Sequence, residues 1–464
     1  MAGDKVSIPG ASMVSSMNHS PDDRDENEDK HYVSRLEIGG LWGYKDVSID
    51  FRSDVNFLIG KNGGGKTTII NLISSILSCN MDAIFKVHFR NARVYFLSAS
   101  GSSRPMLYFS RVSDGDSGPA QSLTIQFFKN SKDKKPLHSA SLPAMYHRGR
   151  QRDVSGLGSF SQRLAPLHPE MASAIGFLCE VTWLSVHRKS EAVNLENDTG
   201  YDSSVDQRIG DLGNRFNQYV TEIDNLIKRE AREFEKKIFS SIIYDSSKYN
   251  YSNNILESID LPSQKTYMST IFGDLGVNKS DYIDKMDYHY ELAENVRRKF
   301  LEKDELRLND LIVLASIFQA DQTARFWLDY QRKVDSHSRG KKFIKEMFEK
   351  FFSNKKLIIL EDGRILFALY RGNNFTNRTF ISPFQLSSGE KQLYIFLMEA
   401  LLERGRPVVY IADEPELSMH VMWQERLVES LRQLNKNAQF IFATHSPDIV
   451  SSFTNNIITL GDDQ

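Results

Sequence analysis

The chain has 464 residues, of which 40% are hydrophobic and 25% are charged, and its formal net charge at pH 7 is −2. A chain of this length and composition forms two or three globular units, and its near-neutral charge excludes a basic surface spread over the whole molecule. The two cysteines, Cys79 and Cys179, exclude a disulfide framework, and no run of about 18 apolar residues predicts a membrane span. We therefore expect a cytoplasmic protein that does not contact a membrane.

The first 31 residues are polar and include a dense acidic run. We expect a disordered, solvated tail there, with a regulatory or partner-binding segment as the alternative. Two alternating runs follow, at residues 31–38 and 47–51, and a loop that contains glycine joins them. This pattern predicts a β-hairpin. Trp42 or Tyr44 at its tip could stack on an adenine, whereas aromatic residues at such tips also serve simple packing.

A glycine-rich segment at residues 60–68 matches the pattern G-x-x-x-x-G-K-[ST]. An apolar run at residues 55–59 predicts a strand before it, and residues 68–73 continue as a helix. In this order, backbone N–H groups and the helix N-terminus surround a phosphate; the alternative is a glycine turn that matches by chance. Lys66 would reach the β- and γ-phosphates, and Thr67 would hold Mg²⁺. The candidate nucleotide-binding residues are Gly60, Asn62, Gly63, Gly65, Lys66, Thr67 and Thr68.

Several short segments after this helix predict further β structure. Three β-like runs, at residues 92–97, 106–111 and 123–128, predict a second β layer beside the nucleotide-binding sheet. Residues 132–163 are basic and loop-like. They could contact nucleic acid or a partner, and a solvated loop is the alternative. A further strand is expected at residues 180–186.

From about residue 205 to residue 352, apolar residues recur at steps of three and four, with charged residues between them. This periodicity predicts a helical insertion of four or five helices. One is a long amphipathic helix over residues 209–242, and another is a separate short helix over residues 341–352. The insertion contains no set of residues that suggests chemistry, so we expect a mechanical or protein-binding role.

A predicted hairpin at residues 356–369, with Asp362 and Gly363 at its turn, returns the chain to β structure. Residues 385–392 then place small hydroxyl and glycine residues at the start of an apolar helix. The N-terminal end of such a helix is a second anion site, and the chain already has one at Lys66. The second site therefore suggests contact with the nucleotide of a neighbouring subunit. Its candidate residues are Ser387, Ser388, Gly389 and Glu390.

Two further buried strands are predicted to end in polar residues. The first, at residues 408–413, ends in Asp413 and Glu414. Asp413 could hold Mg²⁺, and Glu414 could orient and deprotonate a water; the alternative is a strand that merely ends in acidic residues. The second strand, at residues 439–443, leads to His445. Ligands sit at the carboxyl ends of strands in open α/β sheets, which favours a γ-phosphate contact over a structural histidine.

These four motifs resemble those of the ABC-type ATPase superfamily in its SMC- and RecF-like soluble branch, of the AAA15/AAA21 type. The motifs called Walker A, signature, Walker B and H-loop in that superfamily match residues 60–68, 386–392, 411–416 and 443–447. The resemblance implies an α/β fold: an ABC-ATPase head with a P-loop mixed sheet, flanking helices and an antiparallel β layer. The head would comprise residues 32–200 and 353–464, around a helical insertion at 201–352. ATP and Mg²⁺ are the implied cofactors.

The resemblance also implies roles for the site residues. Glu414 becomes the general base, and His445 senses the γ-phosphate. Ser387 and Gly389 would act on the ATP of a second copy of the chain, so that two heads enclose two nucleotides. The glutamine that lies between the two lobes in this superfamily has no clear counterpart here, and Gln126 and Gln151 are weak candidates.

Residues 413–424 and 443–449 are similar to bacterial anti-phage ATPases, first the ATPase subunit of the PARIS system and then the Septu and retron-associated ATPases. This resemblance implies a homo-oligomeric ATPase that holds a separate effector, a Toprim- or HNH-type nuclease, and releases it on sensing a phage-encoded trigger protein. The chain shows no zinc-finger spacing and no HNH-like cluster, so the effector is expected to be another protein. The alternatives are a RecF- or SMC-like DNA clamp and a scaffold in which ATP is structural.

Overall fold

The computed structural model describes residues 31–61, 63–78, 80–113, 120–143, 178, 180–183, 203–243, 259–370 and 379–460. The predicted acidic tail, Asn62, Gln151 and most of the basic segment at 132–163 lie outside these residues. The chain forms two compact units. The first contains the residues up to Arg215, Met347–Ile359 and those from Ile365 onward, and the second contains Phe216–Glu346 and Leu360–Arg364. No helix in the described ranges is long and apolar enough to cross a bilayer.

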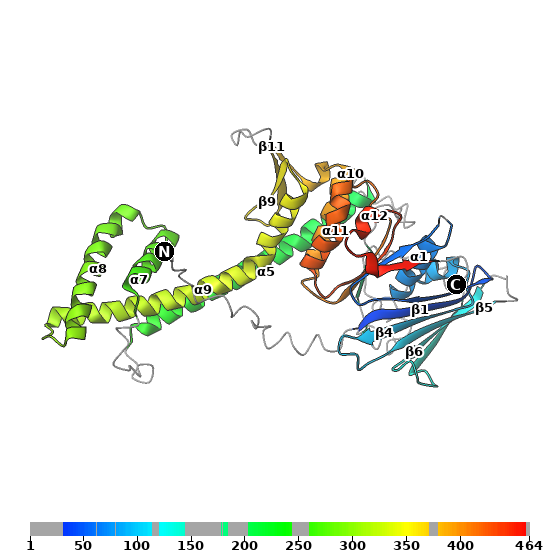
Figure 1. Cartoon of the computed structure of the whole chain (residues 1–464), viewed down its shortest axis with the longest axis horizontal. Coiled ribbons are helices and arrows are strands. Elements are labelled where there is room, and N and C mark those ends of the chain that lie inside the picture. The colour runs from blue at the N-terminus through cyan, green and yellow to red at the C-terminus, as the bar shows by residue number, and fades with distance from the viewer. Residues whose placement is uncertain are drawn as a thin grey trace, which may run out of the picture. The chain divides into compact units, whose positions relative to one another are not determined.

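A parallel sheet forms the centre of the first unit (Figure 1). Its strands, in spatial order, are β14 (Ile457–Thr459), β3 (Val55–Ile59), β13 (Gln439–Ala443), β12 (Val408–Asp413) and β8 (Glu180–Trp183). The three middle strands are almost entirely buried, which explains their continuous apolar sequences. The helices that belong to this part are α1 (Lys66–Leu77), α10 (Ser388–Leu402), α11 (Val421–Leu434) and the short α12 (Pro447–Val450).

An antiparallel sheet forms the second β layer of this unit. Its spatial order is β2 (Lys45–Asp50), β1 (His31–Leu41), β4 (Asn91–Ser98), β5 (Met106–Ser113), β6 (Ala120–Phe128) and β7 (His138–Pro143). The predicted hairpin and the predicted second layer are therefore confirmed. Apolar side chains of this sheet, of α1 and of the parallel sheet belong to one buried cluster, with α2 (Met81–Lys86) at its margin. The α/β fold class is confirmed, but the strands described in the P-loop sheet all pair in parallel, whereas a mixed sheet was predicted.

A small third sheet in spatial order β11 (Thr379–Ile381), β10 (Ile365–Leu369) and β9 (Lys355–Ile359) follows the helical region. The hairpin between β9 and β10 confirms the turn signal, because Gly363 there has a φ of +81°. Short 3₁₀ turns lie at η4 (Pro383–Gln385) and η5 (Thr454–Asn456). An aromatic cluster joins this sheet to α10 and α11. Its members are Phe348, Phe352, Phe367, Tyr394 and Trp423.

Four helices are described between residues 203 and 352: α5 (Ser204–Ser241), α7 (Leu261–Asp274), α8 (Lys279–Glu302) and α9 (Leu308–Phe351). The prediction of a separate helix at 341–352 was wrong, because those residues are the last turns of the 44-residue α9. Gly340 is the only glycine between residues 328 and 340, where no proline occurs. One interior glycine costs about 1 kcal/mol relative to alanine, too little to end a helix that is held on both sides.

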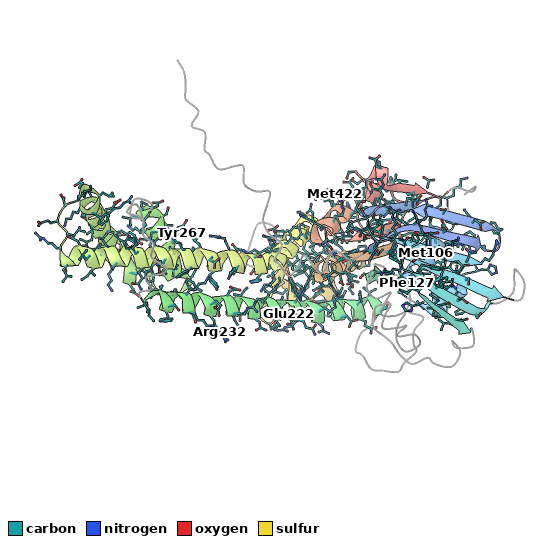
Figure 2. All side chains as sticks on the ribbon, turned by 90° about the horizontal axis from the view of Figure 1, so that it is seen from below. Met106, Phe127, Glu222, Arg232, Tyr267 and Met422 are labelled. Carbon is teal, nitrogen blue, oxygen red and sulfur yellow. The ribbon has the colours of Figure 1, made fainter. Side chains whose placement is uncertain are left out.

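In the second unit, α5 and α9 run antiparallel and are joined by ion pairs. The pairs are Asp224 with Lys341 at 2.6 Å, Glu230 with Lys333 at 2.9 Å, and Lys237 with Asp329 at 3.0 Å. The rings of Phe234 and Tyr330 stack between them, with centroids 5.3 Å apart. Exposed charged side chains cover the outer surface of α5, as Glu222 and Arg232 show (Figure 2).

In the first unit, partly buried ion pairs join the first three turns of α5 to α10. The pairs are Asp206–Lys391, Arg208–Glu399, Arg215–Glu399 and Arg215–Glu403. The side chain of Glu399 is only 1% exposed. Burial raises the pKa of the Glu399 carboxyl, and the two arginines oppose that rise. The start of the helical region is thus fixed to the helix that carries Ser388 and Gly389.

Arg215→Ala is expected to lower the free energy of unfolding by about 2 to 3 kcal/mol, because it removes a positive charge that pairs with the buried carboxylates of Glu399 and Glu403. Urea unfolding followed by circular dichroism measures this. The control is Lys236→Ala on the same helix, which removes half of an exposed pair with Glu233 and should leave the midpoint unchanged. Equal midpoints for the two variants would contradict the prediction.

Candidate nucleotide-binding site

Strand register brings three of the four sequence motifs to one edge of the parallel sheet. In β13, Ala443 pairs with Leu58 of β3 on one side and with Asp413 of β12 on the other. Beyond the strands, the Thr444 N–H donates to the carbonyl of Leu58 at 3.2 Å, and the Glu414 N–H donates to that of Ala443 at 2.8 Å. The glycine-rich loop, the acidic pair and the histidine segment therefore start from neighbouring strand ends.

The phosphate loop, residues 60–68, connects β3 to α1. Gly63 and Gly65 have φ values of +79° and +95°, which side-chain-bearing residues rarely adopt. Gly65 is the N-cap of α1 and supplies no side-chain cap, so the first N–H groups of the helix remain open to an anion. The side chain of Lys66 is buried, and its Nζ donates to the carbonyls of Gly60 at 2.7 Å and Lys61 at 2.9 Å. These features fit a phosphate group.

Trp42 at the hairpin tip packs against the phosphate loop. A Cβ on Gly65 would lie 2.6 Å from Cη2 of the Trp42 ring, so only glycine fits there. Trp42 itself has a φ of +56°, and its N–H donates to the carbonyl of His88 at 2.8 Å. Tyr44 is 79% exposed. Of the two aromatic candidates, Trp42 thus contacts the loop, and Tyr44 leaves its ring open to solvent.

A hydrogen bond joins the loop to the acidic strand end: Thr67 Oγ1 donates to Asp413 Oδ1 at 3.3 Å. Burial raises the pKa of the Asp413 carboxyl; the Thr67 hydrogen bond opposes this rise, and the charges of Glu414 and Glu416 add to it. Hydroxyl and carboxylate oxygens are ligands that Mg²⁺ prefers. The pair therefore fits the predicted Mg²⁺ site, and Thr68 follows in the first turn of α1.

Glu414 sits on strained backbone directly after β12. Its φ is +48°, a left-handed conformation that costs about 1 to 3 kcal/mol for a residue other than glycine. The bond from its N–H to Ala443 and the turn bond from the Leu417 N–H to its own carbonyl hold this conformation. Such strain concentrates at functional sites. Glu414 is partly exposed.

Glu416 is a further residue at this edge that was not predicted as a site residue. Its Oε1 accepts from Thr444 Oγ1 at 2.6 Å and from the N–H groups of His445 at 3.1 Å and Ser446 at 3.2 Å. The imidazole of His445 is exposed. Gln424 of α11 holds the same segment from the other side, since its Oε1 accepts from Ser446 Oγ at 2.7 Å. No local pattern marks Glu416 except its place two positions after Glu414.

The predicted second anion site lies at the start of α10. Ser387 is the N-cap, and both Ser387 and Ser388 are exposed. Glu390 accepts from the Ser387 N–H at 2.9 Å and from Lys355 Nζ at 2.5 Å, so its carboxylate caps its own helix. Burial raises the pKa of Glu390, but these hydrogen bonds outweigh burial and the pKa is lowered. A nucleotide contact by these residues stays a prediction.

Gly389 fits against the acidic strand's loop. A Cβ on this residue would lie 2.2 Å from the carbonyl oxygen of Ser418, which itself has a φ of +69°. Gln392, one turn further along α10, donates from its amide nitrogen to the carbonyl of Pro415 at 3.0 Å. The start of α10 is therefore locked onto the loop that follows Asp413 within the same chain.

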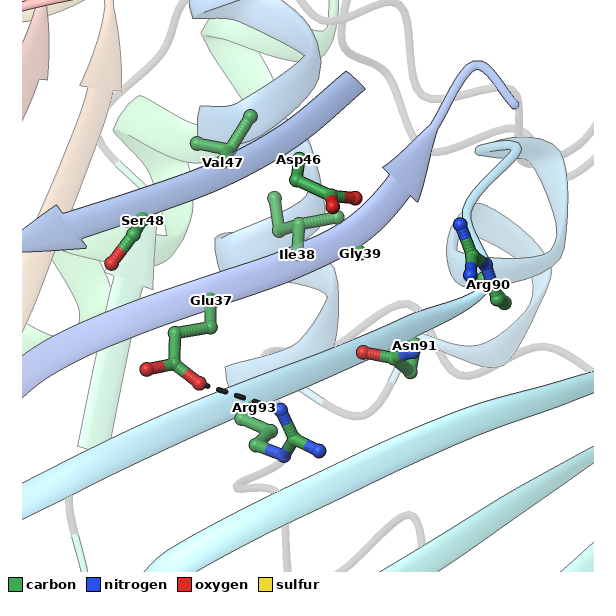
Figure 3. Close-up of a pocket in the computed structure, with 9 residues that line it drawn as sticks. All are labelled: Glu37, Ile38, Gly39, Asp46, Val47, Ser48, Arg90, Asn91 and Arg93. Carbon is green, nitrogen blue, oxygen red and sulfur yellow. Dashed lines mark hydrogen bonds and ion pairs between the residues drawn. The ribbon is translucent and has the colours of Figure 1, made fainter. Parts of the chain in front are cut away.

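One other candidate, Gln126, lies away from this edge. Gln126 lies within β6, paired with Tyr108 of β5, so it is part of the antiparallel sheet. A pocket of about 610 Å³ lies over strands β1, β2 and β4 (Figure 3). Two of its lining residues, Glu37 and Arg93, form an ion pair at 3.5 Å. The lining residues are Glu37, Ile38, Gly39, Asp46, Val47, Ser48, Arg90, Asn91 and Arg93. None of them is a predicted nucleotide-site residue.

The sheet order, the loop after β3 and the acidic residues after β12 together define an α/β P-loop ATPase domain. Residues 204–451 match the family model described as "AAA domain, putative AbiEii toxin, Type IV TA system". This match covers more than half of the chain, and the chain belongs to that family.

Two curated relatives carry ATPase names. The chain is 27% identical over 155 residues to "Retron Ec83 probable ATPase" of Escherichia coli, a match that covers 28% of each chain. It is 34% identical over 96 residues to "Retron Vc95 probable ATPase" of Vibrio cholerae serotype O1 biovar El Tor, a match that covers 18% of each. The matches thus span well under half the length of these relatives.

Among solved structures, the chain is similar to Smc heads. One is the Smc head domain with an extended coiled coil bound to the C-terminal domain of ScpA, from Pyrococcus furiosus: the TM-score is 0.39 at 14% identity, covering 92% of this chain and 93% of that chain. Another is the SmcHead bound to the C-winged helix domain of ScpA, with a TM-score of 0.39 at 13% identity over 92% and 94%. Because both TM-scores are low, we assign the fold from the strand order of the parallel sheet.

Gly65→Ala is expected to weaken ATP binding about tenfold or more, since the new methyl group meets the Trp42 ring and the backbone is left-handed. Titration calorimetry with ATP and Mg²⁺ measures the affinity. Gly101→Ala is the matched control, because Gly101 also has a positive φ, +73°, but open space around it. ATP affinities that match in the two variants would show that the Trp42 contact is unimportant.

The raised pKa of Asp413 predicts a pH-dependent stability. The folded state holds this proton more tightly than the unfolded state, so the associated stability is lost as pH rises from the ordinary aspartate value of 3.8 through the raised pKa. Asp413→Asn should therefore raise the thermal midpoint of the nucleotide-free protein at pH 7, with a gain that shrinks toward pH 3.8.

Asp50→Asn is the control of opposite sign for that measurement. The Arg35 hydrogen bond lowers the pKa of Asp50, so this substitution should lower the midpoint at pH 7. Calorimetric melts of both variants and the unmodified chain across this pH range give the comparison. A lower midpoint for Asp413→Asn at pH 7 would contradict the prediction.

Proposed function

We propose that this protein binds and hydrolyses ATP with Mg²⁺ as an ABC-type ATPase of a bacterial anti-phage defence system. The hydrogen bond between Thr67 and Asp413 is the observation that carries the proposal, because it joins the phosphate loop to the acidic strand end. The family match and the ATPase names of the two retron relatives support it. The finer part of the proposal is that the protein works as the PARIS and Septu ATPases do, and it rests on the resemblance of residues 413–424 and 443–449 to those proteins.

Each residue at the strand edge has a distinct part in this reaction. Lys66 would transfer its Nζ hydrogen bonds from the loop carbonyls to phosphate oxygens. Thr67 and Asp413 would hold Mg²⁺, which neutralises phosphate charge when bound. Glu414 would orient a water and accept its proton, and His445 would donate to an oxygen of the γ-phosphate. The left-handed backbone conformation of Glu414 would set the position of its carboxylate.

The start of α10 supports a role between subunits. Ser387 and Ser388 are exposed, and the helix N-terminus favours an anion. We infer that they complete the nucleotide site of a second copy, so that ATP promotes a homodimer or larger oligomer. A separate effector, a Toprim- or HNH-type nuclease, would be held by this assembly and released when a phage-encoded protein is sensed.

Glu414→Gln is expected to lower kcat about 100-fold or more while ATP affinity changes little, because the amide keeps its shape and loses its basicity. Phosphate release gives kcat, and titration calorimetry gives the affinity. Glu425→Gln, an exposed residue on α11, is the matched control and should hydrolyse ATP like the unmodified protein. Unchanged hydrolysis in Glu414→Gln would instead favour a structural nucleotide.

The same variant tests the assembly. Glu414→Gln should trap the ATP-bound oligomer, so native mass spectrometry after co-expression with the neighbouring genes should show at least a dimer that carries a second protein. A monomer that dimerises only with ATP and retains DNA would move the assignment to a DNA-repair clamp, with a DNA affinity that falls as salt rises.

A further inference from the structure

One carboxylate oxygen accepts several hydrogen bonds from the segment that follows β13. Glu416 Oε1 accepts from three consecutive residues: the Thr444 hydroxyl and the N–H groups of His445 and Ser446. Successive backbone N–H groups that converge in this way form an anion-binding concavity. Here the chain fills that concavity with its own side chain.

The two oxygens of Glu416 have different surroundings. Oε2 is buried, and no donor from the described residues reaches it. All three bonds therefore converge on Oε1, and an uncharged carbonyl oxygen at that position could accept them as well. An amide nitrogen in place of Oε2 would meet no N–H or O–H donor among the described residues.

The residues on either side of His445 are held by further hydrogen bonds, which restrain its backbone. Thr444 is fully buried, and its N–H is bound to the carbonyl of Leu58, next to the phosphate loop. Gln424 holds the Ser446 hydroxyl and also donates to the carbonyls of Met419 at 3.0 Å and Glu416 at 3.4 Å. The backbone of His445 is thus fixed from both sides, whereas its imidazole is exposed.

We propose that Glu416 is the positioning residue of His445: it fixes the backbone of the histidine segment from the loop that carries Asp413 and Glu414. The acidic loop and the histidine segment then move as one body, so that the general base and the γ-phosphate contact keep one relative geometry. This inference rests on the proposed ATP hydrolysis, but the geometry it describes can be tested without it.

The first test measures amide hydrogen exchange by mass spectrometry in the nucleotide-free protein. Glu416→Ala should speed exchange of the His445 amide, which loses its acceptor, more than that of the Ser446 amide, which also donates to Thr444 Oγ1 at 3.0 Å. Glu416→Gln should retain the protection of both amides. The control Glu425→Ala on α11 should leave this segment unchanged. Unaltered exchange in Glu416→Ala would overturn the proposal even if the protein hydrolyses ATP normally.

The second test is a double-mutant cycle on ATP hydrolysis. Glu416→Ala should lower kcat by about 10- to 100-fold, as a misplaced reacting group does, with KM little changed. In a His445→Ala background the same substitution should lower kcat by less than about twofold, because both substitutions disrupt the same interaction. Glu416→Gln should stay within about threefold of the unmodified protein, since its carbonyl accepts the same bonds.

These outcomes separate the inference from the proposed function. Additive losses in the cycle, or a Glu416→Gln variant as slow as Glu416→Ala, would overturn the proposed positioning of His445 by Glu416. A protein that does not hydrolyse ATP at all would refute the proposed function, while the exchange measurement would still decide the positioning role.

Discussion

The pairing of β13 between β3 and β12 is the constraint on which the site depends. Residues from about 55 and from about 440 become neighbours only through this parallel ladder, in which Ala443 is opposite both Leu58 and Asp413. Because parallel strands present their carboxyl ends at the same edge, one register sets the phosphate loop, the acidic pair and the histidine side by side. A slip of β13 by one residue would displace the histidine segment from both the phosphate loop and the acidic pair.

Contacts that no local pattern contains refine this edge. The Trp42 ring closes one side of the phosphate loop at Gly65, and the carboxylate of Glu416 ties two strand ends together. Both contacts join segments that are distant in sequence or in the sheet. The strained backbone at Trp42 and Glu414 shows that tertiary packing, and not local preference, fixes these positions.

The motifs themselves could be predicted because their signals are local. The glycine pattern at 60–68 and the Asp-Gly turn at 362–363 each prescribe a backbone conformation that the structure contains. The continuity of α9 could not be predicted, because it depends on contacts with α5 that no window of sequence includes. Glu399 illustrates the same point, since a glutamate in a helix is expected to face water until its arginine partners on another helix are known.

The tight fit of Gly389 against Ser418 affects how an interface could be dissected genetically. Mixing mutant with unmodified subunits assigns a defect to one side of a shared site only when the mutation leaves its own chain intact. A side chain at Gly389 would push on the loop after Asp413 in its own subunit, whatever it does at the proposed interface, so a defect in such heteromers could not be assigned to the interface alone. Ser388, whose side chain is exposed, is the position at which the two can be kept apart.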